Sequence, residues 1–281
     1  MARKLWINAT ESFGLHKSLE NPPWHYFVSL GFGHVVPNDD FMDGALTLGE
    51  YELVDPSLSR TPLPMPVAEV DTVSGKDGVT IEAGDLAARK ISFDEKAEVG
   101  THQVTASTKE EFFALWEEDG QVCTANKPLS EVKDKNVLTS VKYQAFAKTF
   151  LKHKEWTEPK ELGHALELIP LTDLSDVHVG DWVTFSVKFM GKPFSCTQET
   201  MEFLLASSNT FGGEAGGELE GFFLSAYIVN GRARIKMPTA GQWLINVFSR
   251  QDVTPDNELK ELSDSCNRVY FGSSVTFNVK A

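Results

Sequence analysis

Hydrophobic and polar residues alternate along many short segments of this chain, which is the pattern of β-strands that bury one face. Residues 181–189 show it most clearly, with one side formed by Val183, Phe185, Val187 and Phe189 and the other by Trp182, Thr184, Ser186 and Lys188. Residues 24–30 alternate in the same way and place His25 opposite their main apolar row. Such segments, separated by turn residues, predict an all-β protein built from antiparallel sheets.

Turn and breaker residues divide these strands. Asp119-Gly120 and Asn230-Gly231 each combine a residue that tolerates positive φ with a glycine, as two-residue hairpin turns require. Three prolines in residues 61–66 have the opposite effect, because proline cannot donate a hydrogen bond to a sheet. We expect an edge strand or an extended connector in that segment.

The chain is long enough for more than one core, with 281 residues of which 41% are hydrophobic. A polar, proline-bearing piece, residues 152–160, separates a less regular first half from a more regular second half. Domain boundaries fall in such linkers. The sequence therefore predicts two antiparallel β-sandwich domains in tandem, over residues 1–160 and 161–281.

Composition narrows the classes of partner. The formal net charge is −14 at pH 7 and the isoelectric point is about 4.9. The chain lacks the basic surplus that neutralises phosphates, so we expect no nucleic-acid partner. No apolar run reaches the roughly 18 residues of a membrane helix, so we expect no membrane span.

The cysteines and the N-terminus leave alternatives open. Cys123, Cys196 and Cys266 form no Cys-x-x-Cys pair, and either a Cys196–Cys266 bridge or three free thiols fits the sequence. Residues 1–4 lead directly into an apolar strand-like piece without the long apolar stretch of a signal peptide. Read literally, the chain is cytoplasmic. If Met1 stands in place of a removed signal peptide, the protein is exported.

Residues 29–41 hold the best-defined candidate chemistry. This stretch leaves an apolar strand, passes two glycines that permit close approaches, and places His34 five and six residues before Asp39 and Asp40. An imidazole nitrogen combined with carboxylate oxygens suits first-row transition ions. We therefore predict a metal site formed by His34, Asp39 and Asp40, with His25 as a neighbouring ligand.

Each of these side chains also has a structural alternative. His34 can bond a loop carbonyl while the two aspartates hold a turn, and His25 can face solvent from its strand. Two other acidic segments carry the same pair of interpretations. Residues 173–178 combine two aspartates with His178, and residues 212–221 set three glutamates among five glycines.

Five short segments carry a family resemblance: residues 5–9 (LWINA), 31–40 (GFGHVVPNDD), 179–181 (VGD), 189–193 (FMGKP) and 238–243 (PTAGQW). They resemble an uncharacterised bacterial family whose members are often labelled periplasmic components of nickel or cobalt uptake, of the nickel transport complex subunit type. The resemblance implies export by a signal peptide, a C-terminal sandwich like transthyretin or collagen-adhesin repeat domains, and partnership with a membrane transporter. One departure is Arg3-Lys4, where family members often have a histidine just before the Leu-Trp pair.

The sequence holds no motif of a known enzyme class. It has no Gly-x-Ser-x-Gly elbow, His-Glu-x-x-His helix, phosphate loop or dinucleotide fingerprint. We therefore expect a non-enzymatic, exported protein that holds a nickel or cobalt ion and delivers it to a membrane uptake system. The competing hypothesis is a non-enzymatic structural or interaction module of the cell envelope that binds a protein or a glycan.

Overall fold

The structure is a computed structural model that describes residues 4–12, 24–41, 48–67, 69–197, 202–211, 213–214 and 221–281. In these ranges the regular structure is β-strand, apart from the short 3-10 turns η1 (Lys76–Gly78), η2 (Leu129–Glu131), η3 (Leu174–Asp176) and η4 (Lys260–Leu262). The expected all-β fold is confirmed. Within the described ranges, no helix has the length and apolar character of a membrane span.

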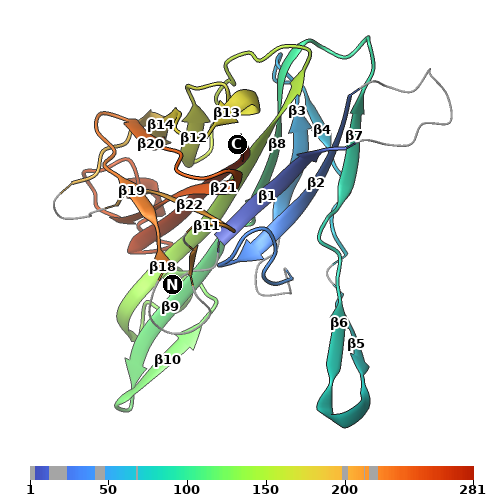
Figure 1. Cartoon of the computed structure of the whole chain (residues 1–281). Helices are drawn as coiled ribbons and strands as arrows, with labels where there is room; N and C mark the ends of the chain where they lie inside the picture. Colours follow the sequence, from blue (N-terminus) through green and yellow to red (C-terminus); the bar gives the residue numbers. More distant parts are fainter. Residues whose placement is uncertain are drawn as a thin grey trace.

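An eleven-stranded sheet forms the centre of the molecule (Figure 1). Its main path runs through β19 (Leu224–Ala226), β16 (Leu204–Ser208), β21 (Gly241–Asp252), β22 (Arg268–Lys280), β11 (Asn136–His153), β8 (Gly100–Thr108), β3 (Leu48–Val54) and β4 (Arg60–Pro62). Three further strands attach to this path, namely β9 (Glu111–Glu118), β10 (Gln121–Ala125) and β13 (Val177–His178).

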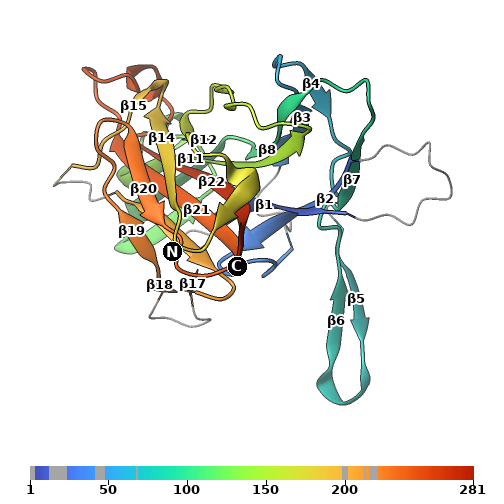
Figure 2. The ribbon, with the colours of Figure 1, turned by 45° about the horizontal axis from the view of Figure 1, so that its top comes forward.

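Two smaller sheets lie towards opposite ends of the central sheet (Figure 2). One contains β1 (Lys4–Glu11), β2 (Trp24–Gly33) and β7 (Arg89–Phe93), and the other contains β12 (Leu166–Pro170), β14 (Trp182–Phe189), β15 (Lys192–Pro193) and β20 (Arg232–Lys236). Two hairpins stand apart from all three sheets, formed by β5 (Asp71–Ser74) with β6 (Thr80–Ala83) and by β17 (Gly213–Glu214) with β18 (Gly221–Phe222).

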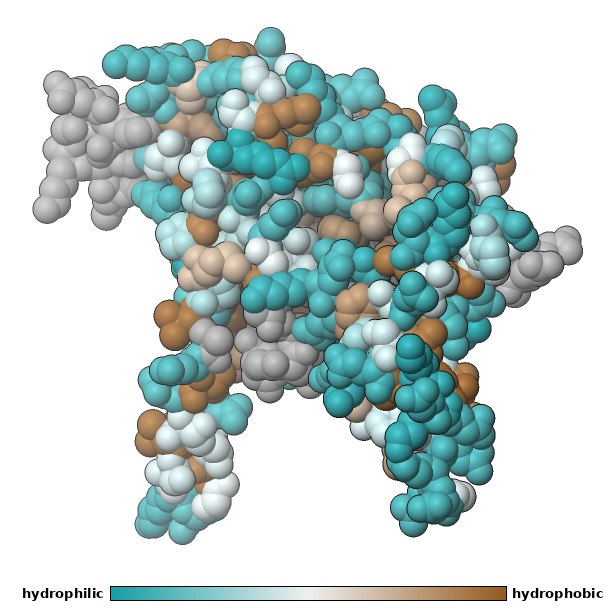
Figure 3. Space-filling view, turned by 180° about the vertical axis from the view of Figure 1, so that it is seen from behind, coloured by the Kyte–Doolittle hydropathy of each residue, from teal (hydrophilic) through white to brown (hydrophobic). Residues whose placement is uncertain are grey.

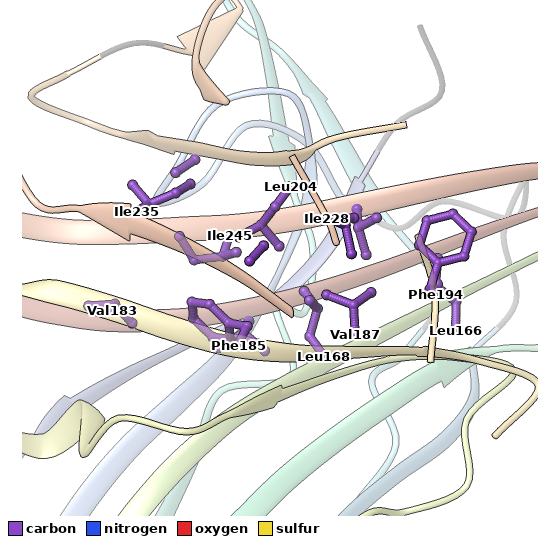
Figure 4. Packing of buried hydrophobic residues seen from close by; sticks show 14 of the residues in the cluster. Leu166, Leu168, Val183, Phe185, Val187, Phe194, Leu204, Ile228, Ile235 and Ile245 are labelled. Carbon is purple, nitrogen blue, oxygen red and sulfur yellow. The ribbon is translucent and has the colours of Figure 1, made fainter. Parts of the chain in front are cut away.

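Each smaller sheet covers its own hydrophobic core. The core under β1, β2 and β7 includes Leu5, Ile7, Val28, Leu30, Val104, Ala147 and Leu151. The core under β12, β14 and β20 is larger, and Figure 4 shows Val183, Phe185 and Val187 of β14 together with Leu204 and Ile245 of the central sheet. Because side chains alternate between the faces of a strand, the two cores lie on opposite faces of the central sheet.

The register of β11 against β22 shows this division. Ala147 lies opposite Ser274 and Lys148 lies opposite Val275. Ala147 belongs to the first core and Val275 to the second. Paired residues share a face of a sheet. Ala147 and Ser274 therefore lie on the face of the first core, and Lys148 and Val275 lie on the face of the second core.

The pairing of β11 with β22 also differs from the all-antiparallel expectation, because these strands are parallel. β11 belongs to the predicted first domain and β22 to the predicted second domain. The central sheet therefore contains strands from both sides of the expected boundary near residue 160. A pattern of alternating residues indicates a strand but not its partner, which is why the shared sheet was not foreseen.

Side chains of β22 close the outer edge of β1. Ser274 Oγ donates to the carbonyl oxygen of Leu5 at 2.6 Å, and Asn278 Nδ2 donates to that of Ala9 at 3.0 Å. Between them, the hydroxyl of Thr276 donates to the carbonyl oxygen of Ile7. Three main-chain acceptors that would otherwise form an open sheet edge thus have partners, and β1 is fixed against the central sheet.

Three local expectations can be compared with the structure. Asp119-Gly120 and Asn230-Gly231 both have positive φ at the two turn positions, as predicted for hairpin turns. β4, the strand that contains the first of the closely spaced prolines, lies at the edge of the central sheet, which is also confirmed. All three cysteines are free, so the alternative without a disulfide holds.

Candidate functional site

The predicted metal loop, residues 34–40, closes onto the end of β2. The N–H of Asp40 donates to the carbonyl oxygen of Phe32 at 3.1 Å. Asp39 Oδ2 accepts the main-chain N–H of His34 at 2.6 Å, and Asp40 Oδ1 accepts that of Phe41 at 2.8 Å. Both carboxylates therefore hold the turn, which is the structural role that the sequence had left as an alternative.

Residues of three distant motif segments meet beneath this loop. Trp6 Nε1 and Asn8 Nδ2 both donate to the carbonyl oxygen of Pro37, at 3.1 and 2.8 Å. Gln242 Nε2 from β21 donates to Asn8 Oδ1 at 2.5 Å. Trp6 itself is completely buried. The residues that carry much of the family resemblance thus form one hydrogen-bonded unit that fixes the loop.

The two glycines of the loop permit close approaches, as expected. Gly31 pairs directly with Trp6 in the β1–β2 register, and a Cβ at Gly31 would lie 2.1 Å from the indole ring. Gly33 has a φ of +125°, and a Cβ there would lie 2.4 Å from Asp39 Oδ2. A side chain at either position would displace the group that fixes the loop.

The structure does not bring His25 to the loop. His25 lies near the start of β2 and His34 follows its end, about 30 Å away at a strand rise of about 3.3 Å per residue. His25 is buried, and its Nδ1 lies 2.7 Å from Ser92 Oγ on the paired strand. His25 and the loop are therefore separated, because one strand places the two histidines at its opposite ends.

No group of three or more histidine, cysteine, aspartate or glutamate side chains in the described residues is arranged to hold a metal ion. His34 is half-buried at the rim of the loop, with Asp39 beside its main chain. The predicted set is thus reduced to His34 and the two aspartates of the same loop.

Two buried imidazoles lie side by side elsewhere, in the first core. The ring centroids of His102 and His153 are 6.4 Å apart, with Phe93 between them at 4.4 and 5.4 Å. Burial and then the neighbouring Lys154 ammonium lower the pKa of His153. This pair was not predicted. The sequence could have predicted that His153 is buried, because it lies two residues after the core residue Leu151 on β11 and therefore on the same face of that strand.

A buried ion pair joins the two halves of the chain. Lys148 Nζ lies 2.8 Å from Glu167 Oε1, and the two residues are only 1% and 2% exposed. Glu167 also accepts the N–H groups of Leu162 and Gly163, at 2.7 and 3.0 Å. Burial alone would raise the pKa of Glu167, but Lys148 and the N–H of Leu162 hold it below its usual range. The pair fixes the residues that follow the linker, 162 and 163, against the central sheet.

His164 extends this buried polar group. Its ring stacks on Phe146 with centroids 4.7 Å apart, and its Nε2 lies 3.3 Å from Thr105 Oγ1. Burial, followed by the charge of Lys148, lowers the pKa of His164 to about 3. The imidazole is therefore neutral at physiological pH and serves as a packed, uncharged member of the group.

A cleft of about 330 Å³ opens where the ends of β1 and β2 approach β11, β22 and η3. Phe150, Phe277 and Leu174 supply apolar surface to its lining. Tyr26 also lines it, and its hydroxyl donates to the carbonyl oxygen of Lys152 at 2.6 Å. Burial raises the pKa of Tyr26 to about 12, so its phenol stays neutral.

Polar groups surround this apolar surface. Hydroxyl and amide side chains in the lining are those of Thr10, Thr149, Ser175, Thr276 and Asn278. The charged members are Glu11, Lys152 and Lys280, and Lys280 Nζ bonds Asp176 Oδ1 at 2.5 Å. With Asp176 counted, two carboxylates balance two ammonium groups, so the cleft carries no net charge.

The second predicted acidic segment proves to be turn chemistry. Asp173 Oδ1 accepts the N–H of Ser175 at 2.8 Å and caps η3. Asp181 Oδ2 accepts the N–H of His178 at 2.8 Å. Lys280 holds the pKa of Asp176 below its usual range through their hydrogen bond. The glutamates of the glycine-rich segment, residues 212–221, lie outside the residues whose side chains the structure describes.

Comparison with known proteins identifies a family. Residues 1–251 match the profile of the family described as "Domain of unknown function (DUF4198)". Comparison with curated proteins finds no match. The match covers most of the 281 residues and includes the loop, the cluster around Trp6 and most of the second core. The chain therefore belongs to the DUF4198 family, and its predicted membership of an uncharacterised family is confirmed.

Proposed function

We propose that this protein is a non-enzymatic binding protein that takes a neutral, polyhydroxylated ligand of the saccharide class in the cleft between β1, β11 and β22. The observation that supports it is the composition of the cleft, where hydroxyl and amide groups surround an apolar surface and the charges cancel. A sugar ring presents both hydroxyls that need partners and apolar C–H faces. Binding sites for small molecules combine the same two kinds of surface.

The size and chemistry of the cleft agree with this ligand class. Its volume of about 330 Å³ lies at the lower end of the roughly 300–1,000 Å³ of small-molecule sites. A strongly anionic or cationic ligand would need an excess of one charge, and Glu11 and Asp176 are matched by Lys152 and Lys280. This is the glycan-binding form of an interaction module of the cell envelope.

Calorimetric titration with a panel of neutral mono- and oligosaccharides tests the proposal. We expect measurable binding, weakened about tenfold in Thr10→Ala, since this variant removes one hydrogen bond worth roughly 1.4 kcal/mol. Thr10 is exposed, so the variant should fold. Thr124→Ala on β10 is the matched control and should bind as the parent does. Absence of binding to every sugar, or equal affinity in all variants, contradicts the proposal.

A second candidate function is capture of a nickel or cobalt ion for a membrane uptake system, in an exported protein. It is favoured by the loop geometry, in which Asp39 is held against the main chain of His34 by a 2.6 Å hydrogen bond, so that an imidazole and a carboxylate leave the same short turn. Such mixed donors suit these ions. The ligands would be His34 with Asp39 or Asp40, and water would complete the coordination.

This candidate predicts that the metal-free protein binds nickel or cobalt with submillimolar affinity by calorimetry, and that His34→Ala abolishes the binding. Loss of one imidazole from a site with so few protein ligands leaves only carboxylates, which hold these ions weakly. The control variant His178→Ala removes an exposed imidazole outside the loop and should bind the metal as the parent does. Binding weaker than millimolar, or unchanged in His34→Ala, rules this function out for the loop.

A further inference from the structure

The hairpin of β5 and β6 forms an arm that projects from the rest of the molecule (Figure 1). All eight of its strand residues are exposed. Val73 and Ile81 are cross-strand partners, 59% and 55% exposed, and Val79 at the turn is 54% exposed. Figure 3 shows this arm as one of two projections on the same side of the molecule, with apolar side chains along it.

An isolated two-stranded hairpin is marginally stable in water. The arm also exposes apolar side chains, and burying them against another surface would be favourable. Its charged side chains are mainly acidic, because residues 69–84 carry Glu69, Asp71, Asp77 and Glu82 against the single Lys76. A surface that covers the arm should therefore be basic and should present apolar or aromatic area.

One face of this same chain has those properties. Arg232, Arg234 and Lys236 are exposed on the outward side of β20, although the whole chain is strongly acidic. Across the strand pair lies Trp182, which is 51% exposed, with the Arg234 guanidinium 4.7 Å from the centre of its ring. We call this surface the basic face.

The basic face has no partner in the described part of the chain. None of its three cations forms an ion pair there. β20 pairs with β14, and its three basic side chains point outward from the face of that sheet. Exposed basic side chains favour an acidic partner.

We propose that the acidic arm of one molecule docks on the basic face of a second copy of this chain. The arm and the basic face lie on opposite sides of the molecule in both ribbon views (Figure 2), so the arm cannot reach the basic face of its own molecule. The contact is head to tail, because the two surfaces differ, and repetition extends it into linear assemblies. Asp71 lies on the same face of the arm as Val73 and Ile81. Its carboxylate meets the cations of β20 while Val73 and Ile81 cover Trp182.

Sedimentation velocity of the purified full chain tests this proposal. At low salt we expect the average mass to rise with protein concentration, and the association to weaken at high salt, because exposed charge pairs are screened. An arm variant, Asp71→Lys with Val73→Lys, and a face variant, Arg232→Glu with Arg234→Glu, should each associate at least tenfold more weakly than the parent. These residues are exposed, so circular dichroism should show both variants folded.

The decisive sample is the equimolar mixture of the two variants. The arm variant retains an intact face and the face variant an intact arm, so the mixture should form a dimer that grows no further. A control variant, Lys109→Glu with Lys133→Glu, changes two exposed lysines elsewhere and should associate as the parent does. A parent that stays monomeric at low salt, or variants whose mixture does not form the dimer, overturns the proposal.

Discussion

Replacing Lys148 by methionine is expected to destabilise the protein by about 3–5 kcal/mol, since removal of one partner leaves a buried charge without compensation. Glu167 is 2% exposed and keeps two main-chain donors, but these do not replace the ammonium group 2.8 Å away. The variant should show a lower midpoint in urea-induced unfolding.

A paired substitution separates this cause from a packing defect. Lys148→Met combined with Glu167→Gln removes both charges and retains an amide oxygen for the linker. We expect the double variant to be more stable than Lys148→Met alone, because no unpaired charge remains buried. A cost below about 1 kcal/mol for Lys148→Met, or no recovery in the double variant, would show that the pair does not join the two halves.

Gly31→Ala is the second substitution with a large expected effect. The new Cβ would lie 2.1 Å from the indole of Trp6, which is completely buried and hydrogen-bonded to the loop through Pro37. Overpacking of this kind costs roughly 1–3 kcal/mol, and we expect the upper end because the indole has no space to move. Urea unfolding measures the loss.

A double-mutant cycle with Trp6→Phe tests the cause. The smaller ring relieves the clash, so Gly31→Ala with Trp6→Phe should be more stable than the sum of the two single costs predicts. Residues in contact show coupling of roughly 0.5–3 kcal/mol, and we expect a value above about 1 kcal/mol. Strict additivity would mean that Gly31 does not serve the approach of Trp6.

Local sequence patterns predicted the strands and turns well. Alternation over residues 24–30 and 181–189 corresponds to β2 and β14, and Asn230-Gly231 is a hairpin turn. Each of these features is decided by neighbours in the chain, through the burial of every second residue or through φ at a turn. The parallel pairing of β11 with β22 depends on strands that lie more than a hundred residues apart, and no local pattern specifies it.

The candidate site was predicted less well, for identifiable reasons. His25 and His34 are only nine positions apart, but one extended strand separates such residues by about 30 Å, which a strand rise of about 3.3 Å per residue could have shown. The contact between Trp6 and Gly31 required the register of β1 against β2. The cleft is formed by the ends of distant strands, and most of its lining residues belong to no recognisable motif.

We propose that the polar residues of the loop serve the fold and that the cleft holds the ligand. Amide chemical shifts of the isotopically labelled protein, followed by NMR during titration with neutral oligosaccharides, test it most directly. The account predicts shifts concentrated at cleft residues such as Thr10, Lys152 and Asn278, with the His34 loop unchanged. Shifts confined to that loop, or no shifts at any sugar concentration, would contradict it.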